Sequence, residues 1–222
     1  MATPPQDNDL IERLSALRAR LDTVDTGIHR LLRERFEIVE EIGAAKGPHE
    51  SVIRPAREAA VIENRLALHS GPMPKAVLAH FWRTMITAAC LVQRPFAIHT
   101  AGALDAALFL YGPTAVTTHD SASEAVAALG HDDVAVVPAD SAWPGAMGEG
   151  VSIINRCEVS GGGSVVVLGG AGVSPGAGPE AAVLRDGALA FIPASDIDAE
   201  DTVLGRYHVF PLPIPASRAS NP

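Results

Sequence analysis

The sequence is poor in cysteine and in positive charge, and it has no long hydrophobic run. Its only cysteines, Cys90 and Cys157, stand in unrelated contexts without a CxxC or metal-ligand spacing, which argues against a cysteine-based metal site. The formal net charge of −9 argues against binding of nucleic acid or of a membrane surface. No apolar run reaches the ~18 residues of a membrane span, and residues 1–9 lack the pattern of a signal peptide. We therefore expect a soluble, cytoplasmic protein.

What the sequence does contain is enough apolar material for a packed core. Of 222 residues, 47% are hydrophobic and 19% are charged, as in ordinary globular proteins. The first part, from Leu10 to Gln93, has a helical pattern. Apolar residues recur there at alternating steps of four and three, which is typical of a helix that packs along another long helix: Leu10, Leu14, Leu17, Leu21, Val24, Ile28, Leu31, Ile38 and Ile42.

Two shorter helices are expected after this long one. The first begins at Pro55 and runs to about His69, and the second runs from about Pro74 to Arg94 and ends before Pro95. The second has an apolar face that includes Phe81, Ile86 and Val92. Beyond Pro95, short β-branched runs alternate with helix-like stretches, which predicts an α/β layout. The predicted organisation is an all-α domain of three helices at 8–95, a small α/β domain at 96–214 and a disordered tail at 215–222.

A cation interrupts the apolar stripe of the long helix, because Arg35 stands where its next apolar residue is due. Lys46 follows eleven residues later, about three turns on and nearly on the same face. Arg35 either snorkels or pairs with an internal carboxylate, or it waits for an anionic ligand. Arg18 lies roughly 25 Å from Arg35 along the helix and about 100° round it. If two such helices pair antiparallel in a dimer, Arg18 of one chain can reach the pocket that holds Arg35 and Lys46 of the other.

More polar residues join this group from the shorter helices. The segment "IRPAREA" places Arg54, Arg57 and Glu58 at a helix start, where free backbone N–H groups also favour anions. Gln93 projects from the third helix. A pocket with several cations, one carboxylate and one amide suits a small dicarboxylate that carries a hydroxyl group.

These residues resemble a known family. The segments "LSALRARLDTVDTGIHRLLRERFEIVEEIGAAKG", "IRPAREAAVI" and "HFWRTMITAACLVQRP" are similar in order and spacing to the all-helical chorismate mutases, in particular to the N-terminal domain of bifunctional chorismate mutase–prephenate dehydratases. The resemblance spans Leu14 to about Pro95. It implies an intertwined helical homodimer with shared active sites, and chorismate as the substrate.

The resemblance also implies residue roles. The dicarboxylate-binding arginines fall on Arg35 and Arg57, with Arg18 supplied by the partner chain. The donors to the ether oxygen fall on Lys46 and Gln93, and the glutamate that binds the hydroxyl falls on Glu58. Two positions depart from the best-known pattern: Arg54 stands where an aspartate is common, and Ala89 replaces a serine that touches substrate in some members.

The implied reaction is the concerted [3,3] rearrangement of chorismate to prephenate, which needs no metal, cofactor or nucleophile. Arginine forks would clamp the carboxylates, and Lys46 and Gln93 would stabilise charge on the ether oxygen. Two alternatives remain open. One is an isochorismate pyruvate-lyase type of pericyclic enzyme, and the other is a non-catalytic dimeric regulatory or binding protein of the same pathway.

The second half carries weaker signals. The segment "DDVAVVPADSAWPGAM" is similar to a prephenate dehydratase segment at Pro138, Asp140, Gly145 and Ala146, but a Thr-Arg-Phe motif is missing. We therefore expect a degenerate, dehydratase-inactive relative. The glycine-rich stretch "GGGSVVVLGGAGVSPGAG" lacks the dinucleotide and phosphate-loop patterns, and it predicts turns that flank a buried strand.

Overall fold

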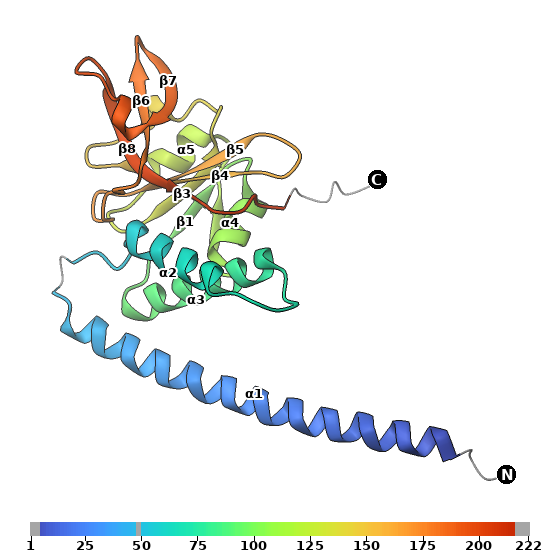
Figure 1. Ribbon diagram of the computed structural model, residues 1–222. Helices are drawn as coiled ribbons and strands as arrows, with labels where there is room; N and C mark the ends of the chain where they lie inside the picture. Colours follow the sequence, from blue (N-terminus) through green and yellow to red (C-terminus); the bar gives the residue numbers. More distant parts are fainter. Residues whose placement is uncertain (1–4, 48–49, 216–222) are drawn as a thin grey trace. The chain divides into compact units, whose positions relative to one another are not determined.

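The computed structural model describes residues 5–47 and 50–215, with side chains from residue 9 onward (Figure 1). The contacts divide the chain into two compact units, one ending at Ala45 and the other beginning at Lys46. We describe each unit by itself.

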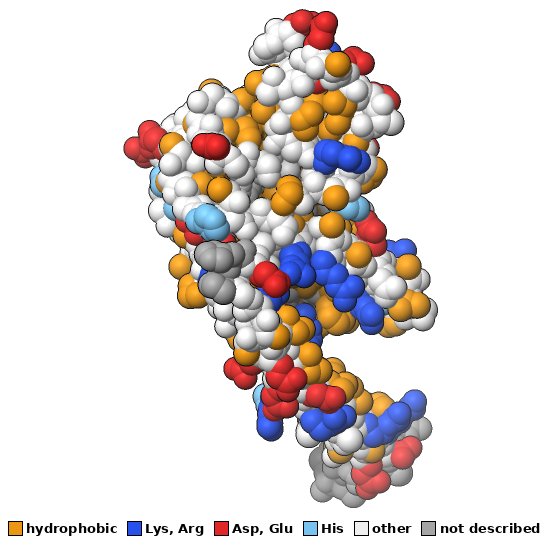
Figure 2. All heavy atoms as spheres, turned by 90° about the vertical axis from the view of Figure 1, so that its left-hand side faces the viewer, with side chains coloured by type: hydrophobic (Ala, Val, Ile, Leu, Met, Phe, Trp, Pro, Cys, Tyr) orange, Lys and Arg blue, Asp and Glu red, His pale blue; other side chains and the backbone are white. Residues whose placement is uncertain are grey.

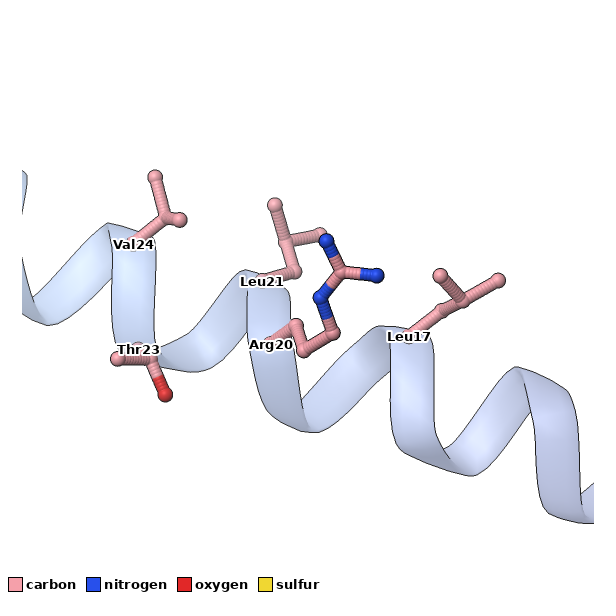
Figure 3. A pocket seen from close by; sticks show the side chains of 5 residues that line it. All are labelled: Leu17, Arg20, Leu21, Thr23 and Val24. Carbon is pink, nitrogen blue, oxygen red and sulfur yellow. The ribbon is translucent and has the colours of Figure 1, made fainter.

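The first unit is one long helix, α1 (Pro5–Ala45), of 41 residues, or roughly 60 Å at ~1.5 Å per residue. Its i,i+4 ion pairs, Arg30–Glu34 at 3.4 Å and Arg33–Glu37 at 3.8 Å, are exposed. The predicted apolar stripe is exposed as well, with Leu21 at 58% and Ile38 at 50% of full exposure. Figure 3 shows Leu17, Leu21 and Val24 pointing to the same side of α1, where they line a shallow hollow together with Arg20 and Thr23.

The second unit begins with two packed helices, α2 (Pro55–Ala67) and α3 (Lys75–Gln93). Proline stands at the first turn of α2, where its missing N–H and fixed φ are tolerated. Helix α3 buries Ala79, Arg83, Ile86, Thr87, Ala89 and Cys90, while Phe81 and Val92 stay nearly half exposed. The predicted apolar face of this helix is therefore only partly buried within the described residues.

Eight strands and two further helices complete the second unit. Their bounds are β1 (Ile98–Thr100), α4 (Leu104–Tyr111), β2 (Val116–Thr118), α5 (Ala122–Ala127), β3 (Val134–Pro138), β4 (Ser152–Glu158), β5 (Ser164–Gly169), β6 (Glu180–Arg185), β7 (Ala188–Pro193) and β8 (Thr202–Val209). Single 3-10 turns lie at Pro144–Ala146 and Ala194–Asp196. The strand order is β2-β1-β3-β5-β4-β8-β6-β7. Strands β2, β1 and β3 run parallel to one another. Strand β5 is antiparallel to both β3 and β4, and β8 runs parallel to β4.

The sheet separates two apolar cores. Because alternate residues of a strand point to opposite faces, Val134 and Val136 of β3 pack in one core and Ala135 and Val137 in the other. The first core also contains buried residues of α2, α3 and α4, whereas the second contains α5 and Trp143. Helices α2, α3 and α4 lie together in Figure 1, away from α5. The second and third helices of the predicted helical domain thus share a core with the α/β part.

The predicted fold class, a helical N-terminal region followed by an α/β domain with a mixed sheet, is confirmed. The domain boundary near residue 95 stays a prediction. Of the predicted tail at 215–222, residues 216–222 lie outside the described residues. Within the described residues, no helix combines the length and the apolar composition that crossing a membrane requires.

Candidate active site

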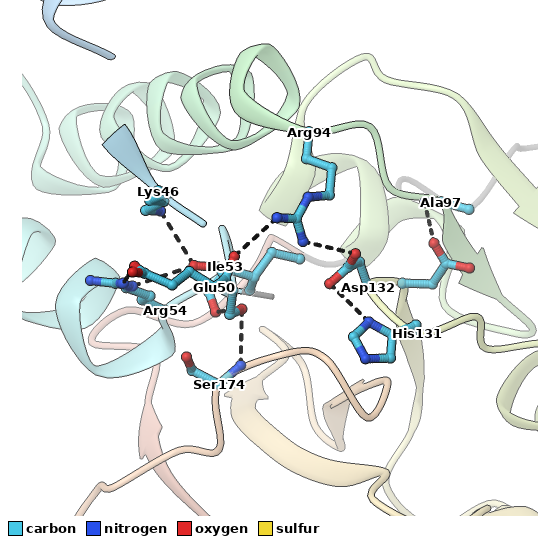
Figure 4. A network of polar contacts seen from close by, with 11 residues as sticks. Lys46, Glu50, Ile53, Arg54, Arg94, Ala97, His131, Asp132 and Ser174 are labelled. Atoms are coloured by element: carbon cyan, nitrogen blue, oxygen red, sulfur yellow. Dashed lines mark hydrogen bonds and ion pairs between the residues drawn. The ribbon is translucent and has the colours of Figure 1, made fainter. Parts of the chain in front are cut away.

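The segment from Lys46 to Arg54 brings two of the predicted site cations together. Lys46 Nζ donates a hydrogen bond to the Ser51 carbonyl oxygen at 3.3 Å, and Arg54 Nε donates to the same oxygen at 3.4 Å. The pKa of Lys46 is lowered, first because burial removes water from the ammonium and next because the charge of Arg54 lies close by. One backbone carbonyl thus holds two cations that repel each other, as part of the contacts drawn in Figure 4.

The start of α2 carries Arg54 and the remaining predicted site cation of this unit, Arg57. Arg54, just before Pro55, pairs with Glu50 at 3.0 Å, and both side chains are about half exposed. Arg57 is exposed and forms no hydrogen bond or ion pair with the described residues. Figure 2 shows several neighbouring Lys and Arg side chains near the middle of the face that it presents, and others that lie apart from them, although the chain as a whole carries a net charge of −9.

Glu58 lies inside the helix pair. It is 7% exposed, its Oε1 accepts a hydrogen bond from the Arg54 backbone N–H at 3.2 Å, and its Oε2 accepts one from Arg83 Nη1. Arg83 Nε also donates to the Leu110 carbonyl of α4 at 2.8 Å, and its guanidinium lies over the Tyr111 ring at 4.9 Å. Burial by itself lowers the pKa of Arg83, but the Glu58 carboxylate, together with Tyr111, more than offsets this and raises the pKa above its usual value. Glu58 therefore has a structural partner of its own.

Gln93 occupies the last position of α3. Its Nε2 donates to the Ala89 carbonyl at 3.0 Å, and its buried Oε1 has no hydrogen-bond partner among the described residues. Such a buried polar atom is rare unless a water or ligand completes it. Ala89, the other predicted position on this turn, is buried, so its methyl group is part of the packing of α3.

Arg18 and Arg35 lie on α1, in the first unit. Arg18 is exposed, whereas Arg35 is partly buried, with its guanidinium 5.5 Å from the centre of the Phe36 ring. The other predicted site residues belong to the second unit, so the joining of these arginines with Lys46, Arg54, Arg57, Glu58 and Gln93 stays a prediction.

Several residues of this region escaped the sequence analysis. Arg83 had a signal, because it stands four residues after Ala79 and three before Ile86, on the face of α3 that is buried. A buried arginine requires a carboxylate partner, and Glu58 is that partner. Ser51 and Arg94 gave no comparable signal, since their contacts come from segments distant in the chain.

The helical part of the chain thus carries several cations and an incompletely bonded amide, which are groups suited to an anionic ligand. Residues 17–94 match the model of the family described as chorismate mutase type II. This segment is thus similar to the type II chorismate mutases, and the resemblance recognised in the sequence is confirmed. The predicted site residues, from Arg18 to Gln93, all fall inside it.

Curated relatives of the chain are described as bifunctional chorismate mutase/prephenate dehydratase. The chain is 37% identical to the one from Neisseria gonorrhoeae over 41% of its length and 25% of the relative's. The identity is 27% to the Pseudomonas aeruginosa protein over 61% of the chain and 41% of the relative, and 30% to the Aquifex aeolicus protein over 51% and 30%. The chain thus spans less than half the length of these relatives. No solved structure matches it significantly.

Proposed function

We propose that the protein is a chorismate mutase, an isomerase that converts chorismate to prephenate on the route to phenylalanine and tyrosine. The observation that carries the proposal is the match of residues 17–94 to the chorismate mutase type II family, together with the predicted cations inside that segment. We also propose that the protein is located in the cytoplasm.

The reaction needs positioning and electrostatic stabilisation, both of which these side chains can supply. Arg35 and Arg57, with Arg18 of the partner chain, hold the two carboxylates in the reactive conformer. Lys46 and Gln93 donate to the ether oxygen as its C–O bond breaks and negative charge grows there. No cofactor or proton transfer is required, so residues that bind and polarise are sufficient.

The local hydrogen bonds leave these donors able to act. An ammonium group has three N–H donors and a side-chain amide has two. Lys46 can therefore keep its bond to the Ser51 carbonyl, and Gln93 its bond to the Ala89 carbonyl, while each presents a further N–H to substrate. The partial burial that lowers the pKa of Lys46 also strengthens its interaction with developing charge, because fewer water molecules screen it.

Glu58 is the predicted acceptor of the substrate hydroxyl, and it also forms the buried pair with Arg83. An ionised carboxylate can accept about four hydrogen bonds, so a hydroxyl can be added to the two bonds described above. Arg54 is expected to bind the substrate carboxylates more weakly than Arg35 and Arg57, because its ion pair with Glu50 reduces its attraction for an anion.

The proposed enzyme is a homodimer built along α1. Ten apolar residues of α1 are at least 42% exposed, and a helix with such a stripe gains stability when the stripe is buried against another helix. Half-burying a leucine or isoleucine contributes about 1 kcal/mol, so the stripe offers on the order of 10 kcal/mol against the cost of association. Pairing would also bring Arg18 of each chain into the site of the other.

The direct test is a spectrophotometric assay of the purified chain with chorismate. We expect loss of chorismate and formation of prephenate, with kcat reduced about 100- to 1,000-fold in Lys46→Ala while circular dichroism stays unchanged. A parallel assay with isochorismate separates the lyase alternative. Turnover of Lys46→Ala at the wild-type rate would remove Lys46 from the mechanism, and failure of the wild type to convert chorismate would refute the function.

A further inference from the structure

We propose that the α/β half positions Lys46 for catalysis, through Ser174 and Asp132, which hold the segment 50–54 in place. Both are positioning residues, since neither lies in the predicted site. The inference rests on the proposed function for its catalytic consequence, and on contacts within the second unit for its geometry (Figure 4).

The first connection runs through Ser51. The Ser174 backbone N–H donates to Ser51 Oγ at 3.0 Å and to the Ile53 carbonyl at 3.3 Å. Ser51 Oγ in turn donates to the Ile53 carbonyl at 2.7 Å. These bonds fix the peptide whose carbonyl accepts from Lys46 and Arg54. A residue 123 positions away in the chain therefore sets the orientation of the acceptor that Lys46 uses.

The second connection runs through Arg94. Its Nη1 donates to Asp132 Oδ2 at 3.1 Å, and its Nη2 donates to the Glu50 carbonyl at 3.2 Å. Asp132 thus holds a guanidinium that bridges to the other end of the same segment. The Asp132 side chain is 21% exposed and that of Arg94 is 26% exposed, so this ion pair is better shielded from water than an ordinary surface pair.

The two anchors belong to one platform. The loops that carry them are bonded to each other, because Gly172 N–H donates to the His131 carbonyl at 2.7 Å and Gly170 N–H donates to the Asp133 carbonyl at 2.9 Å. A Cβ at Gly170 would collide with the Gly130 carbonyl, and one at Gly172 would collide with the His131 ring. The glycine-rich stretch thus permits the close approach of two loops rather than binding a phosphate.

Lys46 depends on this platform because it acts through the placement of a charge. Displacing a catalytic group by about 1 Å can cost 100-fold in rate, and a loose segment 50–54 would let the ammonium move by such a distance or take up more water. Residues 132 and 174 lie outside the segment 17–94 that matches the chorismate mutase family. In this chain the α/β half therefore supplies part of the rigidity of the proposed site.

The test compares Ser51→Ala and Asp132→Ala in the full chain with Asp132→Asn and Asp201→Ala. Asparagine keeps an oxygen that can accept from Arg94. Asp201 pairs with Arg185 at 2.7 Å in the same half but has no bond to the segment, which makes Asp201→Ala the matched control. We expect kcat for chorismate to fall on the order of 10-fold in Ser51→Ala and Asp132→Ala, and to stay near the wild-type value in the other two.

Two further readouts distinguish positioning from a general loss of structure. Amide hydrogen exchange in residues 50–54 should be faster in Ser51→Ala and Asp132→Ala than in Asp201→Ala. In Ser51→Ala the alkaline midpoint of the kcat profile should rise, because a looser Lys46 is better hydrated, whereas partial unfolding would lower kcat without moving that midpoint. An active wild type with unaffected Ser51→Ala and Asp132→Ala overturns the inference alone. A wild type that leaves chorismate unchanged overturns the proposed function and the inference together.

Discussion

Lys46 is the residue on which the proposed chemistry depends most. In that mechanism it must carry a proton to stabilise the ether oxygen, yet burial and then the charge of Arg54 lower its pKa. Glu50 acts in the opposite direction and raises that pKa. The balance of these groups decides the pH range in which Lys46 remains a cation.

This balance predicts the pH dependence of the activity. Activity should decline as pH rises, with a midpoint below 10.5, the ordinary pKa of a lysine. Arg54→Gln should move the midpoint upward, since it removes a cation, and Glu50→Gln should move it downward, since it removes an anion. Profiles of kcat against pH for the three proteins measure these shifts.

The acid side of the same profile tests Gln93. A side-chain amide does not titrate in the working pH range, so activity should persist from mildly acidic to neutral pH. A steep loss between about pH 5 and pH 7, where a carboxylic acid with a raised pKa titrates, would contradict the role assigned to Gln93.

The sequence reveals the site residues more readily than their partners. Arg35 stands out because it interrupts the apolar seam of a periodic helix, and Lys46 because it follows eleven residues later, just after that helix ends. Arg57 and Glu58 follow a proline that begins a helix. The Ser51 carbonyl cannot be recognised in the same way, because every residue has a carbonyl and only the tertiary structure selects one. The same holds for Asp132, whose partner Arg94 lies 38 residues away.

At the scale of elements, the buried ion pair between Glu58 and Arg83 connects the three helices α2, α3 and α4. Glu58 of α2 pairs with Arg83 of α3, and Arg83 also bonds to the Leu110 carbonyl of α4. Both charged side chains are at most 8% exposed. Removing one member leaves the other charged and without its partner, which is far more costly than loss of an exposed pair.

We therefore expect Arg83→Met to lower the free energy of unfolding by about 3–5 kcal/mol. Arg33→Met is the matched control, because it breaks the exposed pair with Glu37 and should cost less than about 1 kcal/mol. Urea denaturation followed by circular dichroism measures both. Equal losses in the two variants would mean that the buried pair contributes no more than an exposed one.

The stripe of α1 makes a second prediction at this scale. Leu21→Glu places a charge in the middle of the stripe and should convert the dimer to a monomer, since burying an unpaired carboxylate is unfavourable. Ala19→Glu adds the same charge on the opposite side of the helix and should leave the dimer intact. Light scattering after size-exclusion chromatography measures the mass of each. A wild-type protein that elutes as a monomer would already contradict the proposed dimer.

The elements differ in how far the sequence predicts them. Helix α1 follows from the strict spacing of four and three between its apolar residues. The pairing of β4 with both β5 and β8 has no such signal, because strand order depends on contacts between distant segments. Phe81 and Val92 show a further limit: the apolar pattern of α3 identifies a face, but not what covers it.

At the scale of the whole molecule, we propose distinct tasks for the two parts of the chain. In this proposal the segment that matches the chorismate mutase type II family supplies the groups that bind and polarise the substrate, and the α/β half holds the segment next to Lys46. The contacts divide the chain after Ala45 rather than at the composition change near Pro95. Sequence composition records where one family segment ends, whereas packing depends on which apolar faces meet, and those of α2 and α3 meet the sheet.

Mixing two inactive variants tests the central claim, that two chains share each chorismate site. Arg18→Ala and Arg35→Ala should each be inactive as homodimers. After subunit exchange in equal amounts, about half of the dimers are mixed, and each of these has one complete site, so about a quarter of wild-type activity should return. If activity does not return although exchange is confirmed by mass spectrometry, Arg18 and Arg35 do not act in one site built from two chains.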